Sequence, residues 1–250
     1  MRVWWREIAG LVLPMACGGC GRPRTRLCER CGQALYGAEP GRVRPAPEPA
    51  GLPVVHAAAP YTDAVRAVLL GHKERGALGL AEPLGLALAG AVRASVPPSA
   101  GLGAGPLLLV PVPSARRAVR ARGHDAARRI AWAAAGQLRR TGTAVRVLPV
   151  LRQRRKVADQ TGLGARQRLV NMAGALEAVA GAERLMAGGR VLLVDDLMTT
   201  GASLVEAARA LRAATDGSSA AFGQVGAAVV AAPLISFHKP ELTGKTHRCS

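Results

Sequence analysis

Apolar residues along the chain follow two alternating patterns. Short continuous apolar runs, typical of strands buried on both faces, are separated by longer segments in which apolar residues recur every three or four positions, as in amphipathic helices. The predicted strands cover residues 54–61, 107–113, 145–150, 190–194 and 224–232. The predicted helices cover residues 62–76, 80–94, 124–140 and 202–214. This alternation predicts an α/β fold, a parallel sheet with helices on both faces.

The chain divides into four regions by composition. Residues 1–36 hold a short amphipathic stretch and four of the five cysteines. Residues 37–53 are rich in proline and glycine, which is typical of a linker. Residues 54–232 carry the alternating patterns, and residues 233–250 lose all periodicity. We therefore expect an N-terminal cysteine module, a linker, one α/β domain and a frayed tail.

Basic residues outnumber acidic ones: 34 Lys and Arg against 16 Asp and Glu give a net charge of +18 at pH 7. This balance favours phosphates, pyrophosphate or nucleic acid as partners, although a basic surface without a specific ligand has the same composition. No apolar segment is long enough to span a membrane. Arg6 and Glu7 interrupt the apolar run before the first cysteine and Pro14 ends it, which favours an amphipathic helix over a lipoprotein signal. We expect a cytoplasmic protein.

Four cysteines form two C-x2-C pairs, Cys17 with Cys20 and Cys28 with Cys31. Each pair can place two thiolates on one metal, so the spacing predicts a tetrahedral Zn2+ site. The zinc would be structural, because four thiolates leave no open coordination position. Two disulfides are the alternative, which the absence of a secretion signal disfavours. Cys249 has no obvious partner in the sequence.

The most informative run, VLLVDDLMTTGAS, covers residues 191–203. A buried strand here is followed by two adjacent carboxylates, Asp195 and Asp196, and a small-residue turn leads into a helix. Backbone N–H groups of such a turn and of the helix N-terminus bind phosphate, and the carboxylates accept hydrogen bonds from hydroxyl groups. The run therefore predicts a site for a phosphorylated sugar.

The same run resembles the motif with which type I phosphoribosyltransferases bind 5-phosphoribosyl 1-pyrophosphate (PRPP). That motif is a hydrophobic stretch, two acids, then Thr-Thr-Gly and a small or hydroxyl residue. The resemblance implies that Asp195 and Asp196 are the catalytic pair that holds the ribose hydroxyls, and that Mg2+ bridges pyrophosphate and ribose oxygens. The residues that it implies for the 5-phosphate are Thr199, Thr200, Gly201, Ala202 and Ser203.

Two further stretches favour a pyrophosphate ligand. Residues 107–131 contain a strand that ends in a rigid loop and is followed by several arginines, which donate bidentately to phosphate oxygens. Residues 151–176 are polar, basic and long enough to act as a lid. The pyrophosphate residues predicted from these stretches are Val112, Pro113, Ser114, Arg122, Arg152 and Arg168. A solvated helix start and an exposed basic loop are the alternatives.

The order of these elements resembles the ComF (GntX-like) family, amidophosphoribosyltransferase-like proteins associated with competence for DNA uptake. The resemblance covers nearly the whole chain to about residue 232 and implies a type I phosphoribosyltransferase fold behind a zinc module. Its matched residues are the four cysteines, Tyr61, Lys73, Val110 to Pro113, Gln160, Leu163, Arg168, Asn171 and the PRPP run. His124-Asp125-Ala126 replaces the family's Phe-Asn-Gln after Arg122-Gly123, which leaves the role of that element open.

Two functions remain open. The first is an enzyme that transfers the phosphoribosyl group of PRPP with loss of pyrophosphate. The second is a non-catalytic module, responsive to PRPP or a nucleotide, that binds single-stranded DNA and works with competence or DNA-processing proteins. Excess arginine favours the second, whereas the few aromatic residues (three Trp, two Tyr and two Phe) count against a base-stacking platform. Turnover of PRPP separates the two.

Overall fold

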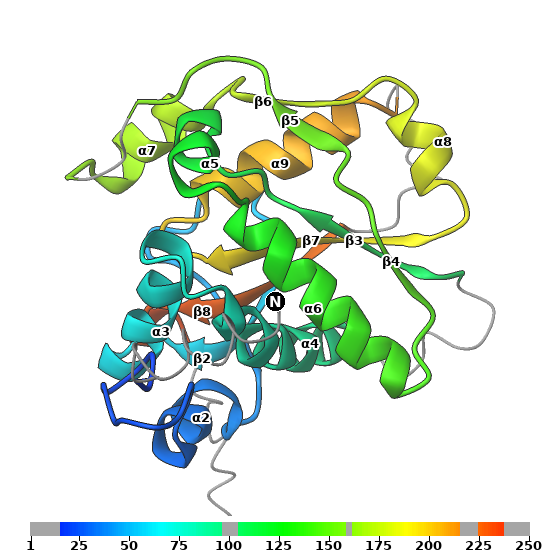
Figure 1. Cartoon of the computed structure of the whole chain (residues 1–250). Helices are drawn as coiled ribbons and strands as arrows, with labels where there is room; N and C mark the ends of the chain where they lie inside the picture. The colour runs from blue at the N-terminus through cyan, green and yellow to red at the C-terminus, as the bar shows by residue number, and fades with distance from the viewer. Residues whose placement is uncertain (1–15, 97–104, 159–161, 216–224, 238–250) are drawn as a thin grey trace, which may run out of the picture.

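A computed structural model describes residues 16–96, 105–158, 162–215 and 225–237. Their centre is a six-stranded sheet of order β1-β2-β8-β7-β3-β4, in which all neighbours are parallel except the edge pair β1 and β2 (Figure 1). The strands are β1 (Gly41–Val43), β2 (Val55–Pro60), β3 (Leu107–Pro111), β4 (Val145–Val147), β7 (Arg190–Leu197) and β8 (Gly226–Ala232). The predicted α/β fold is confirmed, and the predicted parallel sheet is confirmed for β2, β8, β7, β3 and β4; the antiparallel edge strand β1 was not predicted.

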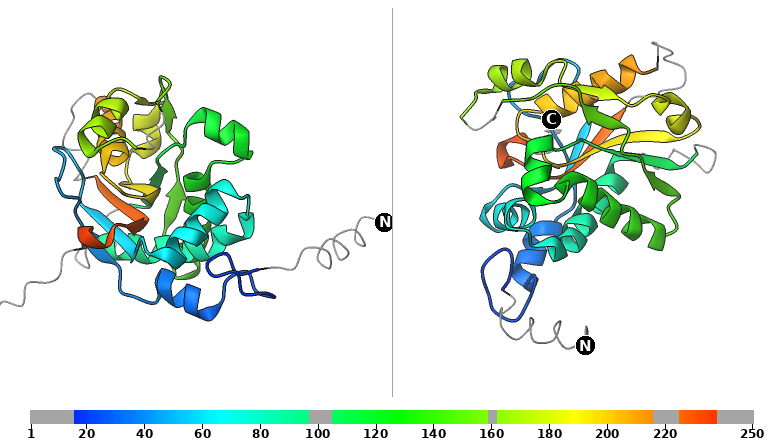
Figure 2. Two further views of the ribbon diagram at one scale, coloured as in Figure 1. Left: turned by 90° about the vertical axis from the view of Figure 1, so that its left-hand side faces the viewer. Right: turned by 45° about the horizontal axis from the view of Figure 1, so that its top comes forward.

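Helices cover both faces of the sheet, which Figure 2 shows nearly edge-on in its left panel. One face carries α3 (Asp63–Glu74), α4 (Ala81–Ser95) and α6 (Ala126–Arg140), and the other carries α7 (Ala165–Met172), α8 (Ala182–Met186) and α9 (Ala202–Ala213). Successive side chains of a strand enter opposite cores: Leu107 and Leu109 of β3 pack under the first layer, Leu108 and Val110 under the second. Burial on both faces explains the continuous apolar runs in the sequence.

All five strands and four helices predicted from the apolar pattern are present, with bounds that differ by a few residues. Residues 37–53, expected to be a linker, contain strand β1. Residues 151–176, expected to be a loop, contain β5 (Leu151–Gln153) and α7 and lead into β6 (Leu176–Ala178), which pairs with β5 in a separate antiparallel ribbon. Such strands of three residues are too short for periodicity to reveal.

The cysteine segment leads into α2 (Glu29–Tyr36), which packs against α3 and α4. The remaining helical elements are α5 (Arg116–Arg122) and the 3-10 turns η1 (Leu78–Leu80) and η2 (Leu234–Ser236). The helix expected before the first cysteine, and most of the tail expected from residue 233, lie outside the described residues. Within the described ranges, no helix combines the length and the apolar character needed to cross a membrane.

Candidate active-site cleft and cysteine cluster

The two sequence stretches singled out for phosphate chemistry follow neighbouring strands, β3 and β7. From β3 the chain passes through α6 to β4 on one side of the sheet, and from β7 it passes through α9 to β8 on the other. The strand order therefore reverses between β3 and β7. In open α/β sheets, ligands bind in the crevice outside the carboxyl ends of the strands at such a switch point.

The acid pair lies at the carboxyl end of β7, which extends through Leu197 and so includes both carboxylates. Because strand side chains alternate, Asp196 faces α3 and Asp195 faces the opposite layer. The Asp196 side chain is 7% exposed, and its Oδ2 lies 2.7 Å from Nζ of Lys73 at the end of α3. Asp195 Oδ1 accepts the backbone N–H of Asp196 at 2.8 Å.

The surroundings of this acid pair shift the pKa values of Asp195 and Lys73. Burial, together with the neighbouring charge of Asp196, raises the pKa of Asp195 well above its ordinary value. Burial lowers the pKa of Lys73, but Asp196 and Asp195 outweigh that effect, so the Lys73 pKa is raised. Lys73 is therefore held as an ammonium ion beside the two carboxylates.

A turn of small residues connects the acid pair to α9. Gly201 has φ 78° and precedes the first helical residue, Ala202. A Cβ atom on Gly201 would lie 2.7 Å from Leu52 Cδ1, so both the backbone conformation and the space require glycine. Residues 197–204 line a small pocket together with Asp195. The helix N-terminus and the turn amides make this pocket suitable for a phosphate.

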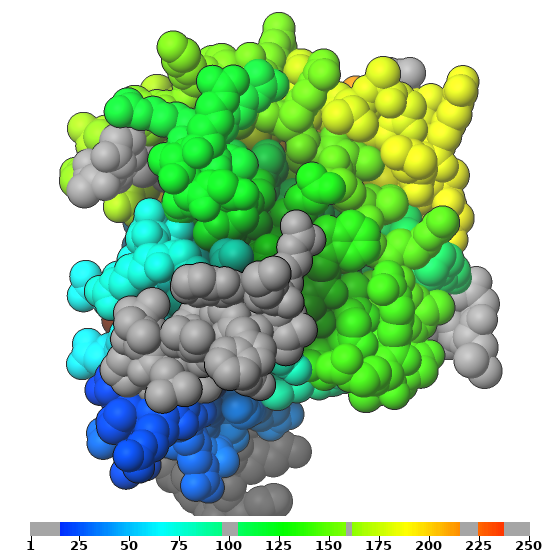
Figure 3. Space-filling view, viewed as in Figure 1, coloured from blue at the N-terminus to red at the C-terminus, as the bar shows by residue number. Residues whose placement is uncertain are grey.

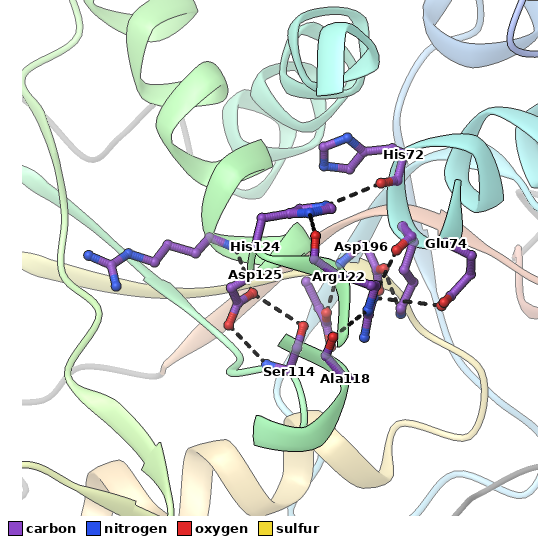
Figure 4. A network of polar contacts seen from close by, with 11 residues as sticks. His72, Glu74, Ser114, Ala118, Arg122, His124, Asp125 and Asp196 are labelled. Atoms are coloured by element: carbon purple, nitrogen blue, oxygen red, sulfur yellow. Dashed lines mark hydrogen bonds and ion pairs between the residues drawn. The ribbon is translucent and has the colours of Figure 1, made fainter. Parts of the chain in front are cut away.

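The loop after β3 is fixed by Asp125, which begins α6. Asp125 Oδ2 accepts the backbone N–H of Ser114 at 3.1 Å, its Oδ1 lies 3.2 Å from Ser114 Oγ, and the same Oδ1 accepts the N–H of Arg128 at 3.2 Å (Figure 4). One carboxylate thus anchors the loop and caps the helix. This contact gives a structural role to the segment that departs from the family pattern.

Arg122 and His124 connect the same region to α3, as Figure 4 shows. The Arg122 guanidinium donates to the carbonyl oxygens of Ala118 at 3.0 Å and of Lys73 at 3.2 Å, and it lies 3.6 Å from Glu74 Oε1. The ring nitrogens of His124 lie 3.1 Å from the Arg122 carbonyl oxygen and 3.2 Å from that of His72. These contacts fix the end of α3 from which Lys73 extends.

A cleft of about 720 Å³ brings most of these residues together, and Figure 3 shows part of it as the recess between α5 (green) and α3 (cyan). The predicted site residues that line it are Val112, Pro113, Ser114, Arg122, Asp195, Asp196, Thr199 and Ser203. Thr200, Gly201 and Ala202 line the adjoining small pocket. The cleft is in the size range of small-molecule sites.

Two predicted arginines lie elsewhere. Arg168, on α7, donates from Nη1 to Thr199 Oγ1 at 3.1 Å, so its contact is with the turn before α9. Arg152 is not among the described residues that line the cleft; its Nε lies 2.8 Å from Glu177 Oε1 on β6. Arg117 and Gln153 line the cleft although neither was among the predicted site residues.

The four cysteines of the N-terminal segment form a separate cluster. Their sulfur atoms lie within 4.8 Å of one another, and those of Cys20 and Cys28 are 3.6 Å apart. Sulfurs around a tetrahedral zinc with Zn–S bonds near 2.3 Å lie about 3.8 Å apart, so the arrangement fits such an ion. All four are free thiols rather than disulfides. The cysteines can therefore hold a metal ion such as zinc.

The backbone around the cysteines allows the thiols to lie close together and changes the pKa of Cys17. A Cβ atom on Gly19 would lie 2.6 Å from Cys31 Sγ, which leaves no room for a side chain there. Burial raises the pKa of Cys17, but hydrogen bonds from the backbone at Cys20, Cys28 and Gly19 outweigh it and bring the pKa to about 6. Burial and the neighbouring thiols raise the pKa of Cys31.

Comparisons with known proteins add nothing to this picture: no family model matches the chain, and no curated protein matches it.

Proposed function

We propose that this chain binds PRPP with Mg2+ in the cleft between β3 and β7, as a ComF-like protein with a type I phosphoribosyltransferase fold. The observation that carries the proposal is the acid pair of β7, which continues directly into a turn of small residues before α9, at the switch point of the sheet. The motif match at residues 191–203 supports the same ligand. A part in competence and DNA uptake rests on the family resemblance alone.

In this proposal the 5-phosphate binds the turn at 199–203, and Arg168, next to Thr199, neutralises part of its charge. The ribose hydroxyls donate to Asp195 and Asp196. The pyrophosphate lies toward the loop at Ser114, where Arg117 also lines the cleft. The ligand then spans the cleft from the N-terminus of α9 to the end of β3.

The transfer step follows from these positions. The bond between ribose C1 and the pyrophosphate oxygen breaks, and its electron pair leaves with the pyrophosphate. A lone pair of the acceptor forms the new bond to C1, and the acceptor's proton passes to the Asp195 carboxylate, whose raised pKa suits it to accept one. Arg117 and Lys73 stabilise the leaving charge. Mg2+ bound with the ligand beside Asp195 and Asp196 would supply further neutralisation of the leaving charge.

The cysteine cluster is proposed as a structural zinc site. Its four sulfur ligands leave no position for a substrate. The cluster packs against Ala64 of α3, and α2, which carries Cys31, packs against α3 and α4; this location supports a role in stabilising the segment that carries Lys73.

Calorimetric titration with Mg2+-PRPP tests the proposal. Asp196→Asn should weaken binding by roughly 1.5–3 kcal/mol, the range for a hydrogen bond to a charged group, or about 10- to 100-fold in Kd. Glu183→Gln makes the same chemical change on the exposed surface of α8 and should leave affinity unchanged. Equal affinity of wild type and Asp196→Asn would refute the assignment.

Release of pyrophosphate separates the enzyme from the non-catalytic module. The assay uses wild-type protein, Mg2+-PRPP and a panel of acceptors. Release above the uncatalysed rate that is lost in Asp195→Asn supports catalysis. Tight PRPP binding without release across the panel supports a module that uses PRPP as a signal.

A further inference from the structure

A second cleft, of about 580 Å³, continues from the first at the start of α5. The two share Ala115, Arg117, Gln153 and Val157, so they form one continuous depression. The residues that line only the second cleft are Arg116, Arg120, Arg154, Arg155 and Lys156.

The lining is strongly cationic. With Arg117, six basic side chains surround this cleft, and no acidic residue is among the described residues that line it. Glu177 lies 2.8 Å from Arg152, which is outside the lining, and 4.0 Å from Arg154. Like charges held together repel, and the cluster is therefore most stable with an anion in the cleft.

Part of this charge is held in place by neutral groups. Arg116 donates from its backbone N to Gln153 Oε1 at 3.0 Å and from Nη2 to the Gln153 carbonyl oxygen at 3.1 Å. Arg155 donates from Nη2 to the carbonyl oxygens of Asn171 and Ala173 at 2.9 and 2.6 Å. Carbonyl partners fix a guanidinium without cancelling its charge, so two of the six cations are preorganised.

Three of the remaining cations are available to a ligand. Within the described part of the chain, the side chains of Arg117, Arg120 and Lys156 have no hydrogen-bond or ion-pair partner. They extend from two elements, α5 and the segment after β5, which lie side by side in Figure 1 and are joined by the contacts of Arg116. Each of the two walls thus carries both fixed and free cations, and such a cleft can donate to several oxygens of one phosphate group.

We propose that this second cleft binds the phosphate group of a small phosphorylated acceptor for phosphoribosyl transfer. The inference rests on the proposed function, because the first cleft then holds PRPP and the shared wall at Ala115 and Arg117 lies beside the pyrophosphate end. The acceptor's nucleophilic nitrogen or oxygen attacks C1, and the pyrophosphate leaves as described above. Among the described residues that line this cleft there is no aromatic side chain for base stacking, which favours a small ligand over single-stranded DNA.

Calorimetry with phenyl phosphate, and with phenol as the probe without phosphate, tests the inference at 0.15 M salt. The titration is made with and without saturating Mg2+-PRPP, which occupies the first cleft. The test variant is Arg120→Gln with Lys156→Gln, since neither residue lines the first cleft. The control variant, Arg140→Gln with Arg146→Gln, removes two exposed charges that line neither cleft.

We expect phenyl phosphate to bind in the presence of PRPP, phenol not to bind, and the test variant to weaken phenyl phosphate about tenfold or more. PRPP affinity of that variant and both affinities of the control should stay within twofold of wild type. Phenyl phosphate affinity that is equal in wild type and test variant overturns the inference. PRPP affinity that falls as much as phenyl phosphate affinity also overturns it, because the cleft then belongs to the pyrophosphate site.

A single-stranded oligothymidylate of 12 nucleotides is titrated in parallel as the nucleic-acid probe. If the affinity for this oligonucleotide falls in the Arg120 and Lys156 variant while the affinity for phenyl phosphate does not, the cleft is a nucleic-acid groove and the inference is wrong. Failure of the proposed function is distinguishable, because it is read from PRPP affinity in wild type and Asp196→Asn. If the wild-type protein binds phenyl phosphate in this cleft but does not bind PRPP, the assignment of the cleft to an acceptor is wrong.

Discussion

The substitution Asp195→Asn should make the protein more stable while it removes function. Asp195 is half-buried next to Asp196, and the ammonium group of Lys73, which pairs with Asp196, compensates part of the charge of the two carboxylates. Asparagine has nearly the same shape. Its Oδ1 can still accept the backbone N–H of Asp196, so the main effect is the loss of one charge.

The magnitude follows from the electrostatics of the pair. Two unit charges about 6 Å apart repel by on the order of 3 kcal/mol at an effective dielectric constant of about 20. Attraction between Asp195 and Lys73, which the substitution also removes, offsets much of this. We therefore expect a net stabilisation of about 1 kcal/mol, or ~2–4 °C in Tm for a protein of this size. Stability gained by removing a functional charge is a common trade-off.

The pH dependence separates this explanation from a change in packing. The pKa of Asp195 is raised in the folded protein, so wild-type stability is highest when this carboxyl is protonated and falls as pH rises through the folded pKa. The asparagine side chain of the variant does not titrate. The Tm difference between variant and wild type should therefore be near zero at pH 4 and grow toward pH 8.

Thermal melts followed by circular dichroism at pH 4, 6 and 8 measure this difference. The matched control is Glu183→Gln, an exposed site on which no such dependence is expected. A variant that is less stable than wild type at pH 8, or a difference that does not change with pH, would refute the electrostatic reasoning. Mg2+-PRPP should stabilise wild type in the same melts and stabilise the variant less, because the variant loses a ligand to the ribose.

Three further outcomes are expected. Metal analysis of wild-type protein purified without chelator should find near-stoichiometric zinc; Cys28→Ser should lose this zinc, whereas Cys249→Ser, outside the two pairs, should keep it. Glu206→Ala should lower the free energy of unfolding in urea by about 2 kcal/mol, because it leaves a backbone N–H of β6 without its buried acceptor. Burial raises the pKa of Glu206, but its hydrogen bonds outweigh burial and lower it, so this loss of stability should shrink as pH falls through the folded pKa. Asp125→Ala should lower Tm through loss of a helix cap worth about 1 kcal/mol, and it should weaken PRPP binding in calorimetry because Ser114 loses its anchor.

Much of the fold could be predicted because its signal is local. Strands β3, β7 and β8 are buried on both faces, so their apolar runs are continuous, and α6 and α9 carry a clear helical period. The ribbon of β5 and β6 left no such signal. Its strands have three residues each and are stabilised by contacts outside themselves, such as Glu206 of α9 accepting the N–H of Leu176 at 2.9 Å. The spacing of apolar residues along the chain cannot reveal tertiary contacts of this kind.

The same distinction explains which site residues could be named in advance. Asp195 and Asp196 are recognisable because acids, turn and helix follow one another along the chain, whereas Lys73 meets Asp196 across 123 positions. The family resemblance includes Lys73, but nothing in the local sequence indicates that this residue pairs with Asp196; only the folded sheet brings the end of α3 to the end of β7. Asp125 did carry a local signal, an acid directly before a helical run, but capping alone does not reveal that the same carboxylate also holds Ser114. The acid pair can therefore be read as a motif, while the groups that set its charge and hold the opposite wall of the cleft depend on the topology.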